Sequence, residues 1–150
     1  MSKKTYKLYF EFVPEECWYS NLRSVLTPAD WDKVRKDAYA RAGYRCCICG
    51  KKDRLEAHEQ WSYDDQLKLQ KLENVLALCH NCHEVKHIFR TQLMGRGAEA
   101  MAHFMRVNGC TQMQFHAALA EANEEYLRRN KVEGWTTDVS WLARLGINLK

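Results

Sequence analysis

The chain has 150 residues, a length that fits one domain with one hydrophobic core. Hydrophobic residues make up 46% of the sequence and charged residues 28%, which favours a globular protein over a disordered one. The apolar runs are too short to cross a membrane, and the first residues lack the apolar segment of a secretory signal, so we expect a cytoplasmic protein with no membrane partner. The net charge of +4 is compatible with a polyanionic partner but does not demonstrate one.

The first predicted helix follows an extended arm. Residues 1–26 mix short apolar stretches with a proline, and they predict an arm with at most one short strand. Thr27 can cap a helix, and the proline that follows it suits the first helical position. Apolar residues then recur at helical spacing up to Gly43, a natural helix stop. A helix is therefore expected over residues 28–42.

The middle of the chain predicts two strands followed by a helix. A turn-like segment precedes residues 54–61, which are predicted to form a strand. Residues 62–71 are polar and predict a loop, and residues 72–78 predict a second strand. A helix is expected from residue 80 to about residue 93.

The C-terminal part predicts three more helices. The first lies near residues 98–107 and ends at an Asn-Gly step. The second starts at a capping box formed by Thr111 and Gln114 and continues to about Asn130. A short final helix is expected near residues 141–145.

Seven cysteines are a high count, and their spacing predicts a metal site rather than disulfides. Each of two C-x-x-C pairs can present both sulfurs to one zinc ion, and two pairs complete a tetrahedral structural site. The intervening residues 50–78 exceed the roughly 15–20 residues of a simple zinc ribbon, which predicts an insertion between the pairs. Cys47 is expected to be a packed or free thiol, because a C-x-C clamp would be poorer. The predicted zinc ligands are Cys46, Cys49, Cys79 and Cys82.

The insertion and the residues after it carry polar residues in a characteristic order. Leu-Glu-Ala-His-Glu at 55–59 is followed by Asn74 before an apolar strand, and then by Leu-Cys-His-Asn-Cys-His at 78–83 at the start of a helix. This order resembles the HNH endonuclease family over about residues 44–90. The resemblance implies an α+β fold with a small ββα-metal (HNH) core that zinc staples, flanked by helices that are mostly C-terminal.

The resemblance also implies how the chain is organised. We expect a single domain over residues 1–150. It would comprise an N-terminal arm and helix over 1–43, an HNH ββα-metal module over 44–92, and a C-terminal helical extension over 93–150. The resemblance does not explain the two flanking parts.

Individual residues inherit expected roles from the family. His58 matches a ligand of the catalytic metal, and His83 matches the ligand at the start of the helix. His87 lies four residues further on the same helix face and matches a second metal-binding histidine of some members. Asn74 matches the asparagine that helps to fix the general base and the hairpin. Glu59 falls where the family normally has its general-base histidine, which is the main departure.

Three interpretations of this departure stay open. In the first, Glu59 is the general base while His58, His83 and His87 hold the metal. In the second, His58 is the base and Glu59 is among the metal ligands. In the third, the site binds nucleic acid without cutting it. A carboxylate can act as a base, especially where burial raises its pKa. The expected catalytic residues are Glu59, His58, Asn74 and His83.

The function implied by the resemblance is a metal-dependent endonuclease that hydrolyses DNA phosphodiester bonds by nicking or cutting. We expect nucleic acid as the partner, specifically double-stranded DNA. The expected cofactors are a structural Zn²⁺ and a catalytic divalent ion, which would be Mg²⁺, Mn²⁺, Ni²⁺ or Zn²⁺. Three imidazole ligands favour the transition ions.

Two alternative functions remain. The first is a zinc-dependent nucleic-acid-binding module without catalytic activity. The second, remote one is a metalloprotease, because residues 83–87 also fit its H-E-x-x-H signature. The protease makes Glu84 essential, whereas the nuclease makes it dispensable.

Other aromatic and histidine side chains have ordinary structural explanations. Trp61 and Tyr63 alternate with Glu59 along the predicted strand and so share its face. They are expected either to pack in the core or to form a wall on which a nucleic-acid base stacks. His103 and His116 lie in helical stretches, and helical periodicity alone accounts for both.

Overall fold

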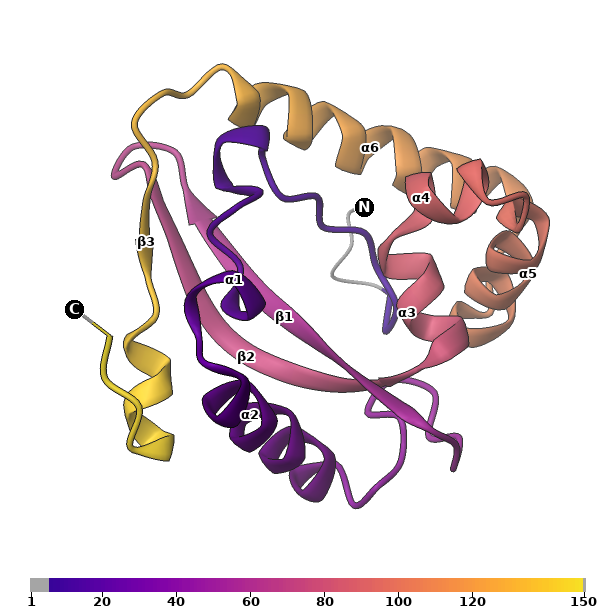
Figure 1. The fold of residues 1–150 in the computed structure, drawn as a ribbon. Coiled ribbons are helices and arrows are strands. Elements are labelled where there is room, and N and C mark those ends of the chain that lie inside the picture. The colour runs from indigo at the N-terminus through magenta and orange to yellow at the C-terminus, as the bar shows by residue number, and fades with distance from the viewer. Residues whose placement is uncertain (1–5, 150) are drawn as a thin grey trace.

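The computed structural model describes residues 6–149, in which helices cover both faces of a three-stranded sheet (Figure 1). Strands β1 (Leu55–Asp64) and β2 (Leu69–Cys79) form an antiparallel hairpin. Strand β3 (Thr136–Asp138) pairs with β2 in parallel, so β2 is central and β1 is an edge strand. The fold is mixed α+β, as the sequence predicts.

The hairpin is longer than the sequence predicts, and the expected loop over residues 62–71 is wrong. β1 continues to Asp64, and only residues 65–68 form the turn. The Asp64 carboxylate accepts hydrogen bonds from two backbone N–H groups of this turn, and Lys68 adopts a left-handed φ of 54°. Backbone pairing with β2 therefore overrides the polar composition of this segment.

A β-bulge lies in the middle of the hairpin. The register shifts between Gln60 and Trp61, and Glu73 of β2 is left without an opposite residue. Leu72 and Val75 consequently face the same hydrophobic cluster although they are three positions apart. A strict two-residue alternation in the sequence cannot reveal such a strand.

The N-terminal part confirms the predicted helix but not the predicted arm. Helix α2 (Pro28–Arg41) starts at Thr27, whose hydroxyl accepts from the Asp30 N–H at 3.1 Å. The arm contains a 3-10 turn, η2 (Glu15–Cys17), and a short helix, α1 (Leu22–Val25), with no strand in its described part. Its first five residues lie outside the described part.

The predicted helix over 80–93 is divided in two. Helix α3 (His80–Lys86) ends at His87, where φ is −109° and ψ is 48°, and helix α4 (Ile88–Leu93) begins. The Thr91 hydroxyl donates to the Glu84 carbonyl at 2.7 Å and to the His87 carbonyl at 3.0 Å. The side chain thus bonds carbonyls next to the break, an alternative to regular helical bonding.

The remaining elements follow the predicted order. They are α5 (Gly97–Asn108), α6 (Gln112–Asn130) and η3 (Ser140–Leu145). The capping box of Thr111 and Gln114 is present at the start of α6. The expected short final helix is present and is a 3-10 helix. No helix in the described part combines the length and apolarity needed to cross a bilayer.

The sheet separates two hydrophobic clusters. One lies between the sheet and helices α3 to α6, and it includes Phe10, Leu78 and Phe104. The other lies between the sheet, α2 and η3, and it includes Val34 and Trp61. Figure 1 shows α2 on one side of the hairpin and α3 to α6 on the other. Alternate residues of β1 consequently face different surroundings.

Candidate metal centres

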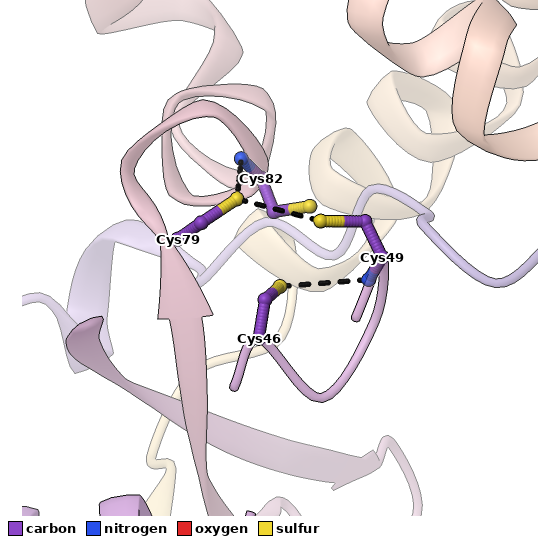
Figure 2. A group of neighbouring side chains, drawn as sticks. All are labelled: Cys46, Cys49, Cys79 and Cys82. Carbon is purple, nitrogen blue, oxygen red and sulfur yellow. Dashed lines mark hydrogen bonds between the residues drawn. The ribbon is translucent and has the colours of Figure 1, made fainter. Parts of the chain in front are cut away.

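The four predicted cysteines lie together where β2 meets α3 (Figure 2). Their sulfur atoms are all within 4.8 Å of one another, and the Cys49 and Cys79 sulfurs are 3.6 Å apart. A zinc ion about 2.3 Å from four tetrahedral sulfurs requires sulfur separations of about 3.8 Å. The cluster could therefore bind a metal ion such as Zn²⁺. Cys47 is exposed and lies outside the cluster.

Local backbone structure positions these sulfurs. In each C-x-x-C pair the second cysteine's N–H donates to the first cysteine's sulfur at 3.5 Å, which Figure 2 shows for Cys46 and for Cys79. Gly50 closes the first turn with a φ of 78°, a conformation that glycine adopts without strain. Hydrogen bonding within the cluster lowers the pKa of the Cys46 thiol to about 4. At least one thiolate, the form that binds metal, is thus favoured at neutral pH.

A histidine from the C-terminal helices contacts the cysteine cluster. His103 of α5 is buried, and its Nε2 lies 3.2 Å from the Cys82 sulfur. Arg106 donates to His103 Nδ1 at 3.1 Å, which places the imidazole proton on Nε2 and aims it at that sulfur. The expectation that periodicity alone accounts for His103 is therefore incomplete.

The three predicted histidines form a second cluster. His58 lies on β1, His83 lies on α3, and His87 follows α3 directly. One nitrogen from each lies within 4.8 Å of the others, and the Nε2 atoms of His83 and His87 are 3.1 Å apart. Three convergent imidazole nitrogens could hold a divalent transition ion.

A carboxylate orients one of these imidazoles. Glu56 lies two residues before His58, on the same face of β1, and its Oε1 is 2.7 Å from His83 Nδ1. Its other oxygen is 3.2 Å from His80 Nδ1. Although partial burial opposes ionisation, hydrogen bonds from the two histidines lower the pKa of Glu56. The ionised carboxylate keeps the proton of His83 on Nδ1 and leaves Nε2 free to bind a metal.

Two of the three histidines, His58 and His87, are neutral at neutral pH. Burial in the cavity wall lowers the pKa of His58 well below its usual value, and Lys86 and the other two histidines add to this shift. Partial desolvation of the ring lowers the pKa of His87 to about 4, although part of the side chain remains exposed. Neutral imidazole is the form that binds metal ions, so no proton must leave these rings first.

Glu59 points away from the histidines. Its carboxylate lies beside Trp61, a residue of the hydrophobic cluster that includes Val34 of α2, whereas the His58 ring contacts the His83 ring of α3. Its carboxylate accepts from the Leu22 N–H at 3.0 Å and from the Trp61 Nε1–H at 3.1 Å. Burial raises the pKa of Glu59 despite these two hydrogen bonds. No hydrogen bond in the described part joins Glu59 to the histidine cluster.

Asn74 supports the hairpin from the outside. Its Oδ1 accepts from Arg41 of α2 at 3.2 Å and from the Val75 N–H at 2.8 Å. The side chain therefore ties α2 to β2 beside the bulge. It makes no described contact with Glu59 and is not part of the cavity wall.

A cavity of about 1160 Å³ surrounds the exposed edge of β1. The three histidines, Glu56 and Glu59 all line it, so both faces of the strand reach the same space. Its described wall carries more cations than carboxylates. The cations are Arg23, Arg35, Arg54, Lys86 and Arg90, and the carboxylates are Glu11, Glu56 and Glu59. The cavity is therefore suited to an anionic ligand.

No family model, curated protein or solved structure matches this chain. The geometry of the two clusters and the cavity is therefore the basis for assigning a function. The sequence motifs predicted no role at the metal sites for two residues that contact the clusters, Glu56 and His103. Glu56 was detectable, because it shares a strand face with His58. His103 was not, because it reaches Cys82 from a separate helix.

Proposed function

We propose that the chain is a metal-dependent HNH-type endonuclease that hydrolyses phosphodiester bonds of nucleic acid. In this proposal the β1–β2 hairpin and α3 are the ββα-metal core, and the cysteine cluster holds a structural Zn²⁺. His58, His83 and His87 hold the catalytic divalent ion. The observation that carries the proposal is the convergence of these three imidazoles on a cation-rich cavity.

The cysteine cluster supports a structural role for the first ion. It joins the loop after α2 to the β2–α3 junction, so an ion there would tie the hairpin to the helix that carries His83. A four-thiolate site is also closed, with no position left for substrate. The donor sets of the two clusters thus suit one structural ion and one catalytic ion.

The chemistry is divided between the ion and the side chains. A divalent ion held by the histidines would supply Lewis-acid stabilisation for the charge that develops on the phosphate. Glu59 takes a proton from the attacking water, whose oxygen forms the new bond to phosphorus as the bond to the leaving oxygen breaks. Burial and a raised pKa suit Glu59 to this step. The leaving oxygen takes a proton from solvent.

The geometry of Glu59 favours a second candidate function. Its carboxylate is bound by Leu22 and Trp61 and faces away from the histidines. If those bonds are permanent, the cavity binds nucleic acid and holds a metal but does not cut. The alternative with Glu59 as a metal ligand has less support, because it is not among the groups that converge with His58.

The remote protease candidate has the least support. The Glu84 carboxylate is bound by Arg96 at 2.6 Å and 3.1 Å, and it does not line the cavity described here. A protease of the H-E-x-x-H type needs this glutamate to activate water beside the metal. Glu84 instead fastens α3 to the segment before α5.

Nicking of supercoiled plasmid by the purified protein tests the proposal. The reaction is scanned across Mg²⁺, Mn²⁺, Ni²⁺ and added chelator, with His83→Ala and Glu59→Gln beside the unmodified chain. His116→Ala and Glu99→Gln are matched controls, since neither residue lines the cavity. We expect ion-dependent nicking that His83→Ala abolishes and Glu59→Gln slows by about 10²–10⁴-fold.

The outcomes separate the two candidates. Nicking that the two controls retain and the two site variants lose supports the nuclease with Glu59 as base. Absence of cleavage with every ion, on supercoiled plasmid and on a single-stranded oligonucleotide alike, in a folded and zinc-loaded protein, supports the binding module. If Glu59→Gln nicks at the unmodified rate, Glu59 has a structural role and another group is the general base.

A further inference from the structure

The cavity continues past the histidine cluster to the other face of β1. On that side its wall consists of the arm, α1 and α2. The volume of about 1160 Å³ exceeds the roughly 300–1,000 Å³ of pockets that hold a small molecule. A single phosphate beside the histidines would leave most of this space empty. The rest of the cavity has room for further groups of a nucleic-acid strand.

Aromatic rings line this second part of the cavity. Trp18 comes from the arm, and Trp31 and Tyr39 come from α2. Trp18 is 50% exposed, and Trp31 and Tyr39 are half-buried against the cluster that includes Val34. Each ring thus has a part that is not covered by the core. We call this region, formed by Trp18, Trp31, Tyr39 and Arg23, the aromatic lobe.

Positive charge accompanies the rings. The Arg23 guanidinium lies 5.8 Å from the centroid of the Trp31 ring. Arg23, Arg54 and Arg90 line the cavity and form no ion pair with any described carboxylate. They come from three separate segments of the wall, namely α1, the residue before β1, and α4. Unneutralised guanidinium groups beside aromatic rings are typical of surfaces that bind single strands of nucleic acid.

We propose that the aromatic lobe binds an unpaired base of the strand whose phosphate lies at the histidine cluster. The inference rests on the proposed function and narrows its substrate to single-stranded or locally unpaired nucleic acid. In a duplex both faces of each base are covered by its neighbours, so a base cannot stack on a protein ring until it leaves the helix. A concave cavity with rings on its wall suits such an exposed base. This departs from the expectation of intact double-stranded DNA.

Fluorescence of 2-aminopurine tests the proposal, because stacking on an aromatic ring quenches this base analogue. A single-stranded oligonucleotide with one 2-aminopurine is titrated with zinc-loaded protein, without further divalent ion so that it stays uncut. A duplex of the same sequence is titrated in parallel. We expect quenching and tighter binding for the single strand. Trp31→Leu should weaken single-strand binding by roughly 5- to 150-fold.

Two further variants protect the test against misfolding. Arg23→Gln changes an exposed side chain and should weaken binding. The logarithm of the affinity should also fall less steeply with the logarithm of the salt concentration, by about the amount expected for one lost phosphate contact. Tyr44→Leu removes an exposed ring outside the cavity, and it should bind as the unmodified chain does. The melting temperature of each variant shows whether it is folded.

Two results would overturn the inference. One is duplex binding that equals or exceeds single-strand binding. The other is unchanged quenching in folded Trp31→Leu together with unchanged binding by Arg23→Gln. The nicking assay separates this failure from that of the proposed function. If the protein nicks plasmid but does not quench 2-aminopurine, it is a nuclease whose aromatic lobe does not bind a base. If it quenches 2-aminopurine but does not cut, the aromatic lobe binds a base and the proposed nuclease function is wrong.

Discussion

The Glu56 carboxylate and the His83 imidazole form a 2.7 Å hydrogen bond between β1 and α3. This bond fixes both the rotation of the ring and the position of its proton, because an ionised carboxylate can only accept. His83 Nε2 then faces His87 Nε2 at 3.1 Å. The orientation that a metal ion needs is therefore built into the protein before an ion arrives.

Replacement of Glu56 by glutamine should weaken the histidine site without unfolding the protein. An amide can still accept from His83 but carries no charge, so it supports the imidazole less well. We expect a loss of about 10–100-fold in Ni²⁺ affinity, measured by calorimetry on zinc-loaded protein. Glu99→Gln is the matched control. Equal affinities in the two variants would mean that Glu56 serves only to join β1 to α3.

Replacement of His103 by alanine should weaken the cysteine site. The variant removes the N–H group that points at the Cys82 sulfur and leaves that thiolate without this donor. We expect the variant to bind zinc about 10-fold more weakly, measured by competition with a chelator. We also expect a shift of the sulfur-to-metal absorption band of the Co²⁺-substituted protein. His116→Ala is the control. An unshifted band in a folded variant would restrict His103 to packing.

The metal-free histidine cluster should make stability depend on pH. Unfolded histidines gain protons near pH 6.5, whereas burial lowers the folded pKa of His58 and brings that of His87 to about 4. Between these values the unfolded chain binds more protons, so the free energy of unfolding falls as the pH falls from about 6.5 toward 4. Above about pH 6.5 these two histidines no longer make the free energy of unfolding depend on pH.

Urea unfolding at pH 7.5, 6 and 5 measures this dependence. The variant His87→Asn lacks one of the two titrating groups, so its stability should fall less over the same interval. Both proteins contain the cysteine cluster, so its contribution cancels when their losses of stability over the same pH interval are compared. Identical losses in the two proteins would contradict neutral burial of His87.

Replacement of Glu84 by glutamine should leave nicking within about twofold of the unmodified rate. Its carboxylate binds Arg96 and does not line the cavity. Because the Arg96 side chain is 44% exposed, loss of this pair should lower stability by about 1 kcal/mol. Plasmid nicking and thermal unfolding of the same sample measure both effects. Loss of nicking with unchanged stability would contradict the expectation that Glu84 is dispensable for the nuclease.

Local signals account for the parts of the fold that the sequence predicts well. Thr27 and Thr111 act within three residues of themselves, and both caps form as expected. The C-x-x-C pairs also depend on short turns, and their sulfurs converge as predicted. The two caps and the turn within each C-x-x-C pair are determined by neighbours in the chain. The meeting of the two pairs joins segments about 30 residues apart, and the sequence predicts it only through the spacing typical of zinc sites.

Contacts between distant segments account for most of what the sequence does not reveal. Strand β3 exists because Thr136 pairs with Leu69, and nothing in its three residues predicts that partner. The side of the strand that Glu59 faces depends on where α1 and α3 pack. His103 reaches Cys82 across 21 positions of the chain. Such pairings follow from tertiary packing, which overrides local preference.

Parallel measurement of metal binding and nicking tests whether the histidine cluster holds the catalytic ion. Zinc-loaded protein is titrated with Ni²⁺ by calorimetry, and each point of the titration is assayed for plasmid nicking. We expect one Ni²⁺ to bind per chain, nicking to rise in step with occupancy, and His83→Ala to lose both. A folded, zinc-loaded chain that binds no second ion, or that nicks equally well without one, would show that the histidine cluster is not a catalytic metal site.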